Sequence, residues 1–143
     1  MYGSLDISTS GMVAQRVRLE SISANLANSN TLLDKQGNLN PYRRREVFFA
    51  PGNPSAVGKE GRNLGVHVAA IGLDKAEVVP QRWDPSNPFA FKEGKYKGYV
   101  AETGINSVVE NVNALEAVRA YEANVMAAEA TKQIMASSLR LLA

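Results

Sequence analysis

Apolar residues recur every seven positions near the start of the chain, and this spacing predicts an amphipathic helix over about residues 5–28. The repeat consists of Leu5, Met12, Leu19 and Leu26. Ile22 falls between the last two at helical spacing, and the charged residues lie mostly outside this stripe. Because nothing within one helix covers its own stripe, we expect this helix to pack against another element.

A longer apolar stripe predicts a second helix over about residues 106–142, with no Pro or Gly inside it. Ser107 followed by Glu110 fits a capping box at its start, and Asn106 is the other candidate for the cap. Alanines at positions 120, 123, 127 and 130 either admit a second neighbouring helix or simply favour helix formation. This helix is the longer one, so a simple hairpin of the two would leave one end uncovered.

The segment between the helices is rich in Gly, Pro and Asn and contains short β-like runs. We expect strands over residues 42–49, 65–71, 77–79 and 96–100, with a break at 58–61. The predicted fold is mainly α with a small β insert, in which the N- and C-terminal helices pair as a coiled coil. Residues 1–30 and 105–143 supply the coiled-coil domain, and residues 31–104 form the loop-rich β segment.

Two asparagines close the first helix, although asparagine is a poor helix former. Asn28 is expected to end the helix, because asparagine tolerates the left-handed conformation of a C-cap. Asn25 lies a turn earlier and needs another explanation. A buried amide that bonds to a neighbouring backbone would explain it, and would also fix the register of the packing.

Composition excludes several classes of protein. The 143 residues carry a net charge of only +2, which does not favour a nucleic-acid or membrane-surface protein. There is no cysteine, no cleavable leader pattern and no apolar run of membrane-spanning length.

Side-chain chemistry is equally sparse. His67 is the only histidine, on a predicted strand, where a packed or edge role is more common than catalysis. Residues 43–45 are three arginines, and on a strand only two can share a face, as at a solvated edge or a salt bridge to an acidic partner. The sequence therefore predicts no catalytic site, no metal site and no cofactor, and neither nucleic acid nor a small-molecule substrate as partner.

Four short stretches resemble motifs of a known family. Residues 24–31, Ala-Asn-Leu-Ala-Asn-Ser-Asn-Thr, resemble the signature that closes the N-terminal helix of bacterial flagellar axial proteins. Residues 84–88 and 98–100 resemble the Asp-Pro-x-Asn-Pro turn and Gly-Tyr-Val of the proximal-rod subunits within that family, and residues 118–124 resemble its C-terminal segment. Residues 32–40 depart from the commoner pattern, in which a Thr-x-Gly-Tyr stretch follows the signature directly.

The resemblance implies a structural subunit of the bacterial flagellar proximal rod, which polymerises through its terminal helices into the drive shaft that transmits torque. It implies as partners copies of itself, other rod subunits, the base (MS) ring and rod-adaptor proteins, without direct membrane insertion. It also implies a periplasmic location in the flagellar basal body and type III export. The alternative is a stand-alone coiled-coil adaptor that binds one helical partner.

Both readings predict a subunit interface on the two helices. The expected interface residues are Leu5, Met12, Leu19, Ile22, Asn25, Leu26, Asn28, Val112, Leu115, Val118, Tyr121, Val125, Ala128, Met135, Leu139 and Leu142.

Overall fold

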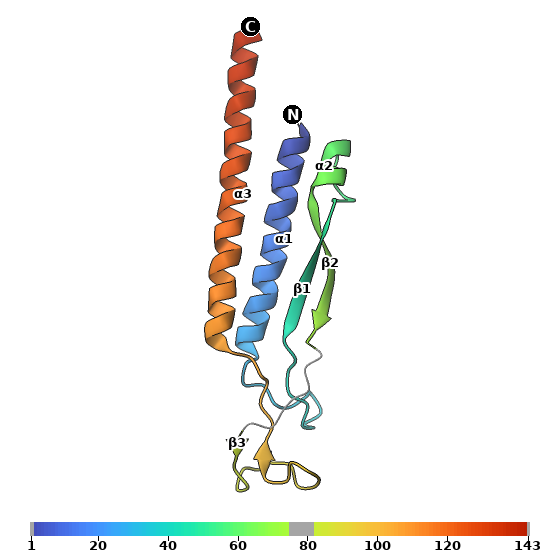
Figure 1. The fold of residues 1–143 in the computed structure, drawn as a ribbon, viewed down its shortest axis with the longest axis vertical. Helices are drawn as coiled ribbons and strands as arrows, with labels where there is room; N and C mark the ends of the chain where they lie inside the picture. The colour runs from blue at the N-terminus through green and yellow to red at the C-terminus, as the bar shows by residue number, and fades with distance from the viewer. Residues whose placement is uncertain (1, 75–81, 143) are drawn as a thin grey trace.

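Two long antiparallel helices and a small antiparallel sheet make up the fold. The computed structural model describes residues 2–74 and 82–142. Its elements are, in order, α1 (Tyr2–Ala27), β1 (Arg45–Pro51), α2 (Lys59–Leu64), β2 (Val66–Leu73), β3 (Arg82–Trp83), β4 (Tyr99–Val100) and α3 (Ser107–Leu142). Figure 1 shows α1 lying between α3 and the β1–β2 pair, with β3 and β4 in a separate tip beyond the end of α1. The predicted mainly α fold with a β insert is confirmed.

The contact between α1 and α3 is made by small and polar residues. Gly11 and Asn25 of α1 are buried, as are Ala117 and Glu110 of α3. The four leucine and methionine residues of the predicted seven-residue repeat remain half-exposed beside this contact. The stripe is therefore not the centre of the intrachain packing, because small side chains bring the two backbones closer than leucines would allow.

Gly11 marks one of these close approaches. A Cβ added at this position would lie 2.6 Å from Oδ1 of Asn124, whose amide nitrogen donates a hydrogen bond to the Ala120 carbonyl at 2.7 Å. Any side chain at position 11 therefore displaces an amide that already has a defined partner.

Gly11→Ala is expected to lower the free energy of unfolding by about 1–2 kcal/mol through overpacking. This is opposite in sign to the gain of up to about 1 kcal/mol that alanine brings to an unobstructed helix. The double variant Gly11→Ala/Asn124→Ala should recover the loss, since it removes the obstructing amide. Denaturant unfolding measures the stability of both variants. If Gly11→Ala alone were more stable than the natural chain, the closeness of Gly11 to Asn124 would not restrict the side chain at position 11.

The sheet pairs β1 with β2 in antiparallel register, from Arg45 opposite Leu73 to Pro51 opposite Val66. The register shifts between Phe48 and Phe49, so Ala69 has no partner across the ladder. Two predicted strands are thus confirmed with shifted ends. Residues 42–44 stay outside the ladder because they run toward the end of α1, where Tyr42 N donates to the Thr31 carbonyl at 2.9 Å.

Three further predictions for the middle segment concern the break at 58–61 and the strands at 77–79 and 96–100. The expected break at 58–61 is wrong, because Lys59–Leu64 forms the short helix α2. This turn is held by its surroundings: Gly58 N donates to Asp6 Oδ2 at 2.9 Å, and Arg62 Nε donates to the Ala56 carbonyl. The strand expected at 96–100 shortens to two residues, and the one expected at 77–79 lies outside the described residues.

The tip is built around an aromatic pair. Trp83 of β3 and Tyr99 of β4 meet edge to face, with ring centroids 5.1 Å apart. Gly98 has φ of +83°, and a Cβ there would lie 2.7 Å from the Trp83 ring, so only glycine fits beside this ring.

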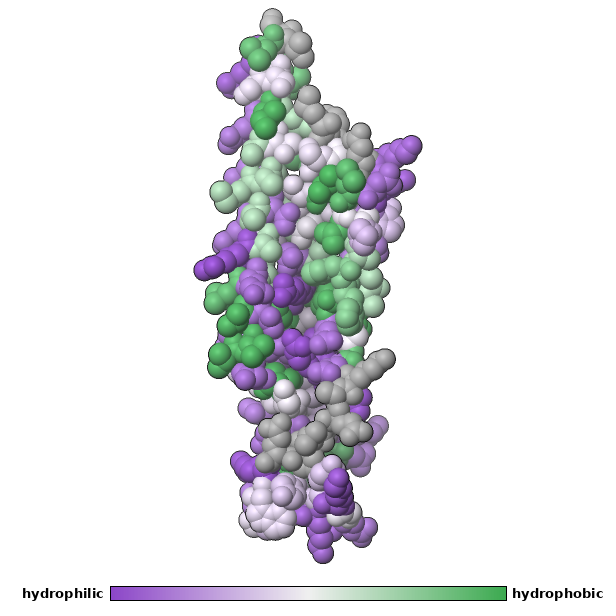
Figure 2. Space-filling view, viewed as in Figure 1, coloured by the Kyte–Doolittle hydropathy of each residue, from purple (hydrophilic) through white to green (hydrophobic). Residues whose placement is uncertain are grey.

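Many large apolar side chains lie on the surface of the subunit. Within the described residues, the fully buried apolar side chains are mostly alanines, while phenylalanines of β1 and most valines and leucines of α3 are exposed. Figure 2 shows them gathered over the first turns of α3 and over the β1–β2 side. A surface of this kind is typical of a protein that buries it against other chains.

Candidate assembly interface

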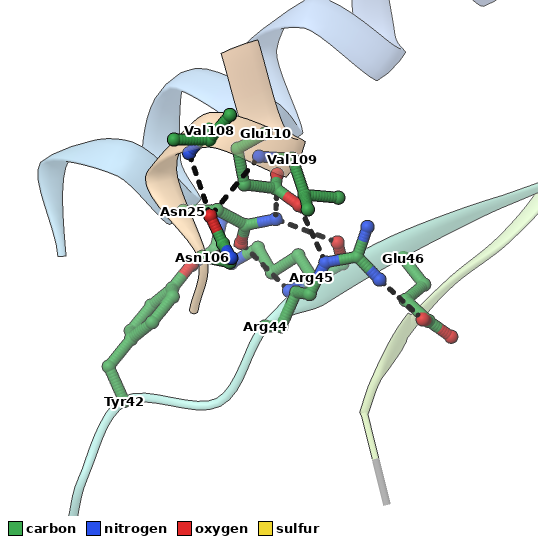
Figure 3. Close-up of polar contacts among 9 residues, drawn as sticks. All are labelled: Asn25, Tyr42, Arg44, Arg45, Glu46, Asn106, Val108, Val109 and Glu110. Carbon is green, nitrogen blue, oxygen red and sulfur yellow. Dashed lines mark hydrogen bonds and ion pairs between the residues drawn. The ribbon is translucent and has the colours of Figure 1, made fainter. Parts of the chain in front are cut away.

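A buried polar cluster fixes the angle at which α1, α3 and β1 meet. Its centre is the Asn25 side chain, which is 0% exposed (Figure 3). The amide nitrogen donates to the Arg45 carbonyl and to Glu110 Oε2, both at 3.0 Å. The amide oxygen accepts from Arg45 N at 2.8 Å and from the Tyr42 hydroxyl at 3.3 Å. Asn25 thus pairs with the main chain of β1 as a neighbouring strand would, and the predicted amide-to-backbone bond is confirmed.

Glu110 is the second centre of this cluster and is 1% exposed. Besides the Asn25 amide, it accepts a hydrogen bond from Arg44 Nε at 2.7 Å, and Arg44 Nη1 reaches Glu46 at 2.8 Å. The hydrogen bond from Arg44 to Glu110 raises the pKa of Arg44, which outweighs the opposing effect of its partial burial. We call Asn25, Tyr42, Arg44, Arg45 and Glu110 the polar junction.

The predicted capping box of α3 is wrong, because its glutamate serves this junction. Asn106 is the cap instead: its Oδ1 accepts from Val108 N at 2.9 Å and Val109 N at 3.3 Å. Glu110 is one turn inside the helix and is free to point toward α1. The spacing of Ser107 and Glu110 therefore matches the capping-box pattern, but Glu110 makes tertiary contacts in place of the local hydrogen bond.

The first helix ends as expected at Asn28, but through a side-chain hydrogen bond and not through a left-handed C-cap. Asn28 Nδ2 donates to the Ala24 carbonyl at 2.8 Å, which satisfies a carbonyl of the last turn. Within the described residues only glycines have positive φ, so Asn28 does not adopt the left-handed conformation.

The side of α3 opposite the junction is uncovered and carries large apolar side chains, with Arg119 and Glu122 among them. Val108, Val112, Leu115 and Met126 recur at helical spacing, and Leu115 and Met126 are 62% and 69% exposed. We call these four residues the outer face of α3. Glu110, Ala117 and Asn124, at spacings of seven, face α1, so the outer face points away from the rest of the subunit.

An apolar groove lies on the other side of α1, between this helix and β2. Its volume is about 470 Å³, and its lining includes Val13, Val17, Val57, Val66 and Val68. Val13 and Val57 are exposed there. The subunit therefore carries an apolar ridge on one side and an apolar groove on another.

Comparisons with known proteins identify the family of this chain. The family described as flagella basal body rod protein matches residues 5–32, which include most of α1 and Asn25. The flagellar basal-body rod protein FlgC of Borreliella burgdorferi is 36% identical over 151 aligned positions, covering 99% of this chain and 97% of that protein. The chain belongs to the FlgC family of flagellar basal-body rod proteins.

Other FlgC proteins are similar over nearly their whole length. That of Bacillus subtilis is 35% identical over 150 aligned positions, covering 98% of this chain and 97% of that protein. That of Escherichia coli O157:H7 is 35% identical over 140 positions, covering 95% and 93%. The resemblance seen in short motifs is thus confirmed, and the chain is a structural subunit of the flagellar basal-body rod.

A FlgC protein needs surfaces for assembly, and the predicted interface residues fall into three groups. Asn25 and Ile22 are buried inside the subunit. Half-buried residues are Leu5, Met12, Leu19, Leu26, Asn28, Val125, Ala128 and Met135. Exposed residues are Val112, Leu115, Val118, Tyr121 and Leu139, while the side chain of Leu142 lies outside the described part. The exposed apolar residues of α3 that were not among the predicted interface residues include Val108, Met126, Ile134 and Leu141, and Met126 follows Leu115 after three helical turns.

His67 of the FlgC chain lies next to a main-chain carbonyl. His67 Nδ1 lies 2.6 Å from the Gly52 carbonyl at the end of the sheet. Among the described residues, no three His, Asp or Glu side chains gather as a metal site. No helix in residues 2–74 or 82–142 is long and apolar enough to cross a membrane.

Proposed function

We propose that this FlgC chain polymerises through its terminal helices to build the proximal rod, the part of the drive shaft that transmits torque from the motor. The observation that carries the proposal is the uncovered outer face of α3. In the assembled rod, α1 and α3 form coiled-coil contacts with neighbouring helices, and residues 1–30 and 105–143 act as one domain. Residues 31–104 form a second, loop-rich unit.

The geometry of the two apolar surfaces supports an open assembly. The outer face of α3 fits the groove between α1 and β2 of a neighbour, which is a heterologous contact. Contacts of this type do not close on a two-fold axis but continue into rings or helical tubes. A stand-alone adaptor with one partner would have no use for both surfaces, so membership of the rod family and this geometry favour the same reading.

One such contact alone is weak, which has a consequence for assembly. Because the four side chains of the outer face are 50–71% exposed in the subunit, covering them contributes roughly 4–8 kcal/mol. Association costs about 4–15 kcal/mol in lost freedom of motion, so the net gain per contact is small. Stable rods therefore require each subunit to contact several neighbours at once. We expect these to be further copies, other rod subunits, the MS ring and rod-adaptor proteins in the periplasm, reached through type III export.

Oxidation of Met126 tests the proposal. In the isolated subunit Met126 is exposed, and a mild oxidant should convert it to the sulfoxide rapidly. In basal bodies that contain the chain, the same residue should be protected at least tenfold, as measured by mass spectrometry of its peptide.

Trp83, which is exposed on the tip and outside the proposed contact, provides the internal comparison. Equal oxidation of Met126 in free and assembled protein, with Trp83 unchanged, would exclude the outer face as an interface.

A further inference from the structure

The tip holds a tryptophan that is exposed but fixed in position. Trp83 is the only tryptophan of the chain and is 61% exposed. Its ring meets that of Tyr99 edge to face, and it lies so close to Gly98 that a Cβ there would collide with it. A large side chain that is already ordered loses little conformational entropy when a partner covers it. Exposed tryptophans held in this way are typical anchor residues of binding surfaces.

An apolar hollow of about 490 Å³ lies beside this ring. Its apolar lining consists of Trp83, Pro85, Pro88, Ala90 and Phe91. Main-chain hydrogen bonds hold its walls together, since Gly98 N donates to the Phe91 carbonyl and Phe91 N donates to the Tyr99 carbonyl, both at 2.9 Å. The hollow is therefore formed before any partner arrives, and its volume falls within the range of ligand sites, roughly 300–1,000 Å³.

Two lysines border the hollow without an acidic partner. Lys92 and Lys97 belong to its lining and are exposed. Within residues 2–74 and 82–142 neither ammonium group forms an ion pair, whereas Arg82 of the same tip is already paired with Asp84 at 3.3 Å. Glu93 follows Lys92 in the sequence but is not part of the lining. The hollow therefore favours a ligand that offers apolar surface together with carboxylates.

Shape and lining distinguish between the ligands that have both properties. An anionic lipid surface would be met by side chains that protrude, whereas these surround a hollow. A glycan needs many hydrogen-bonding groups, but the lining is mainly apolar, with Asn87 and the two lysines as its polar side chains apart from the indole nitrogen. Grooves lined by aromatic side chains bind proline-containing peptides, because such peptides are already extended before they bind.

We propose that the hollow binds an extended, proline-containing segment of a partner protein, in which apolar residues are flanked by Asp or Glu. An apolar side chain of the segment enters beside Trp83, and the flanking carboxylates meet Lys92 and Lys97. A short segment buries less than the roughly 1,200 Å² of a stable interface, so the contact is transient and is lost when basal bodies are isolated. It uses no residue of the outer face of α3 and is independent of the proposed polymerisation.

Fluorescence of Trp83 in the isolated full-length chain tests the proposal. The probe is the synthetic peptide acetyl-Glu-Pro-Leu-Pro-Glu-amide, which should change the emission in a saturable way as it covers the ring. Its affinity should fall as salt is added, because the carboxylate–lysine attraction is screened. The basic peptide acetyl-Lys-Pro-Leu-Pro-Lys-amide should give no saturable change. Equal binding of both peptides, or no saturable response to the acidic one, would overturn the proposal.

Charge reversal at the rim provides the matched variants. Lys92→Glu/Lys97→Glu should bind the acidic peptide at least tenfold more weakly and should bind the basic peptide instead. Lys132→Glu makes the same reversal at an exposed position of α3 outside the hollow, and should leave the affinity unchanged. If the emission of the double variant without peptide shows a disturbed tip, Lys97→Gln takes its place and should weaken binding at least threefold. Unchanged affinity in the folded rim variant would overturn the proposal.

Two further probes separate the peptide from the other ligands. A tetramer of N-acetylglucosamine and vesicles of phosphatidylglycerol should both leave the Trp83 emission unchanged. A saturable response to either one, at concentrations where the acidic peptide gives none, would assign the hollow to a glycan or to a lipid surface and overturn the peptide. Emission that shifts with protein concentration alone would mean that a second copy fills the hollow, which would also overturn it.

Discussion

Replacing Glu110 with alanine is expected to lower the free energy of unfolding of the isolated subunit by about 2–4 kcal/mol. The carboxylate holds Arg44 Nε at 2.7 Å and Asn25 Nδ2 at 3.0 Å while being almost fully buried. Its removal leaves a buried amide with one bond fewer and a guanidinium without its main partner. The Arg44 side chain is 31% exposed, so its hydration by water offsets part of the lost interaction free energy. Denaturant unfolding followed by circular dichroism measures the difference.

Two variants sharpen this result. Glu116→Ala removes another glutamate of α3 that pairs with an arginine, but its side chain is 63% exposed and the atoms are 3.4 Å apart, so the expected loss is below about 1 kcal/mol. Glu110→Gln keeps one acceptor oxygen and should fall between the two. Equal losses for Glu110→Ala and Glu116→Ala would mean that burial at the junction contributes nothing.

Leu115→Asp is expected to abolish rod assembly without unfolding the subunit. Leu115 lies in the outer face and is already exposed to water, so the free chain loses little. In an interface, the change removes about 1–2 kcal/mol of apolar burial, because Leu115 is 62% exposed in the free chain, and it buries an unpaired carboxylate at further cost. A loss of at least 100-fold in association follows. Swimming in soft agar and the protein content of isolated basal bodies measure it, beside circular dichroism of the purified chain.

Gln36→Glu is the matched control for this charge. It adds a carboxylate to an exposed loop position outside the outer face, and removes no apolar side chain. Swimming should remain close to that of the natural chain. If both variants swim normally, the outer face is not an interface, and if Leu115→Asp fails to fold, the assembly result carries no weight until a milder change such as Leu115→Ser is compared.

The role of Asn25 could be predicted in part from the sequence. An asparagine inside a helix competes with its own backbone, so a buried partner is a sound inference from one residue. The partners themselves could not be predicted, because Arg45 and Glu110 lie 20 and 85 positions away. Their approach depends on where β1 crosses the end of α1. Glu110 was assigned to a local cap for the same reason, since sequence spacing carries no information about distant donors.

The seven-residue repeat from Leu5 to Leu26 correctly predicts a helix but not the face that meets α3. Periodicity locates apolar side chains, whereas the intrachain contact is decided by how closely two backbones approach, and Gly11 decides that here. The half-exposed stripe is what a second partner would cover. The helix α2 was missed because its flanking glycines predict a break, while distant groups such as Asp6 hold the turn.

The polar junction also bears on how the chain folds. Its two central side chains, Asn25 and Glu110, are separated by 85 positions, and Arg44 comes from between them. A growing chain that still lacks α3 has the Asn25 amide and the Arg44 guanidinium without the Glu110 carboxylate that they share in the folded subunit. Contacts between such distant positions form slowly, since the loop must close first. Folding of this subunit therefore cannot be completed before α3 is available. A chain shortened before α3 is expected to remain partly folded and not to form a smaller stable structure.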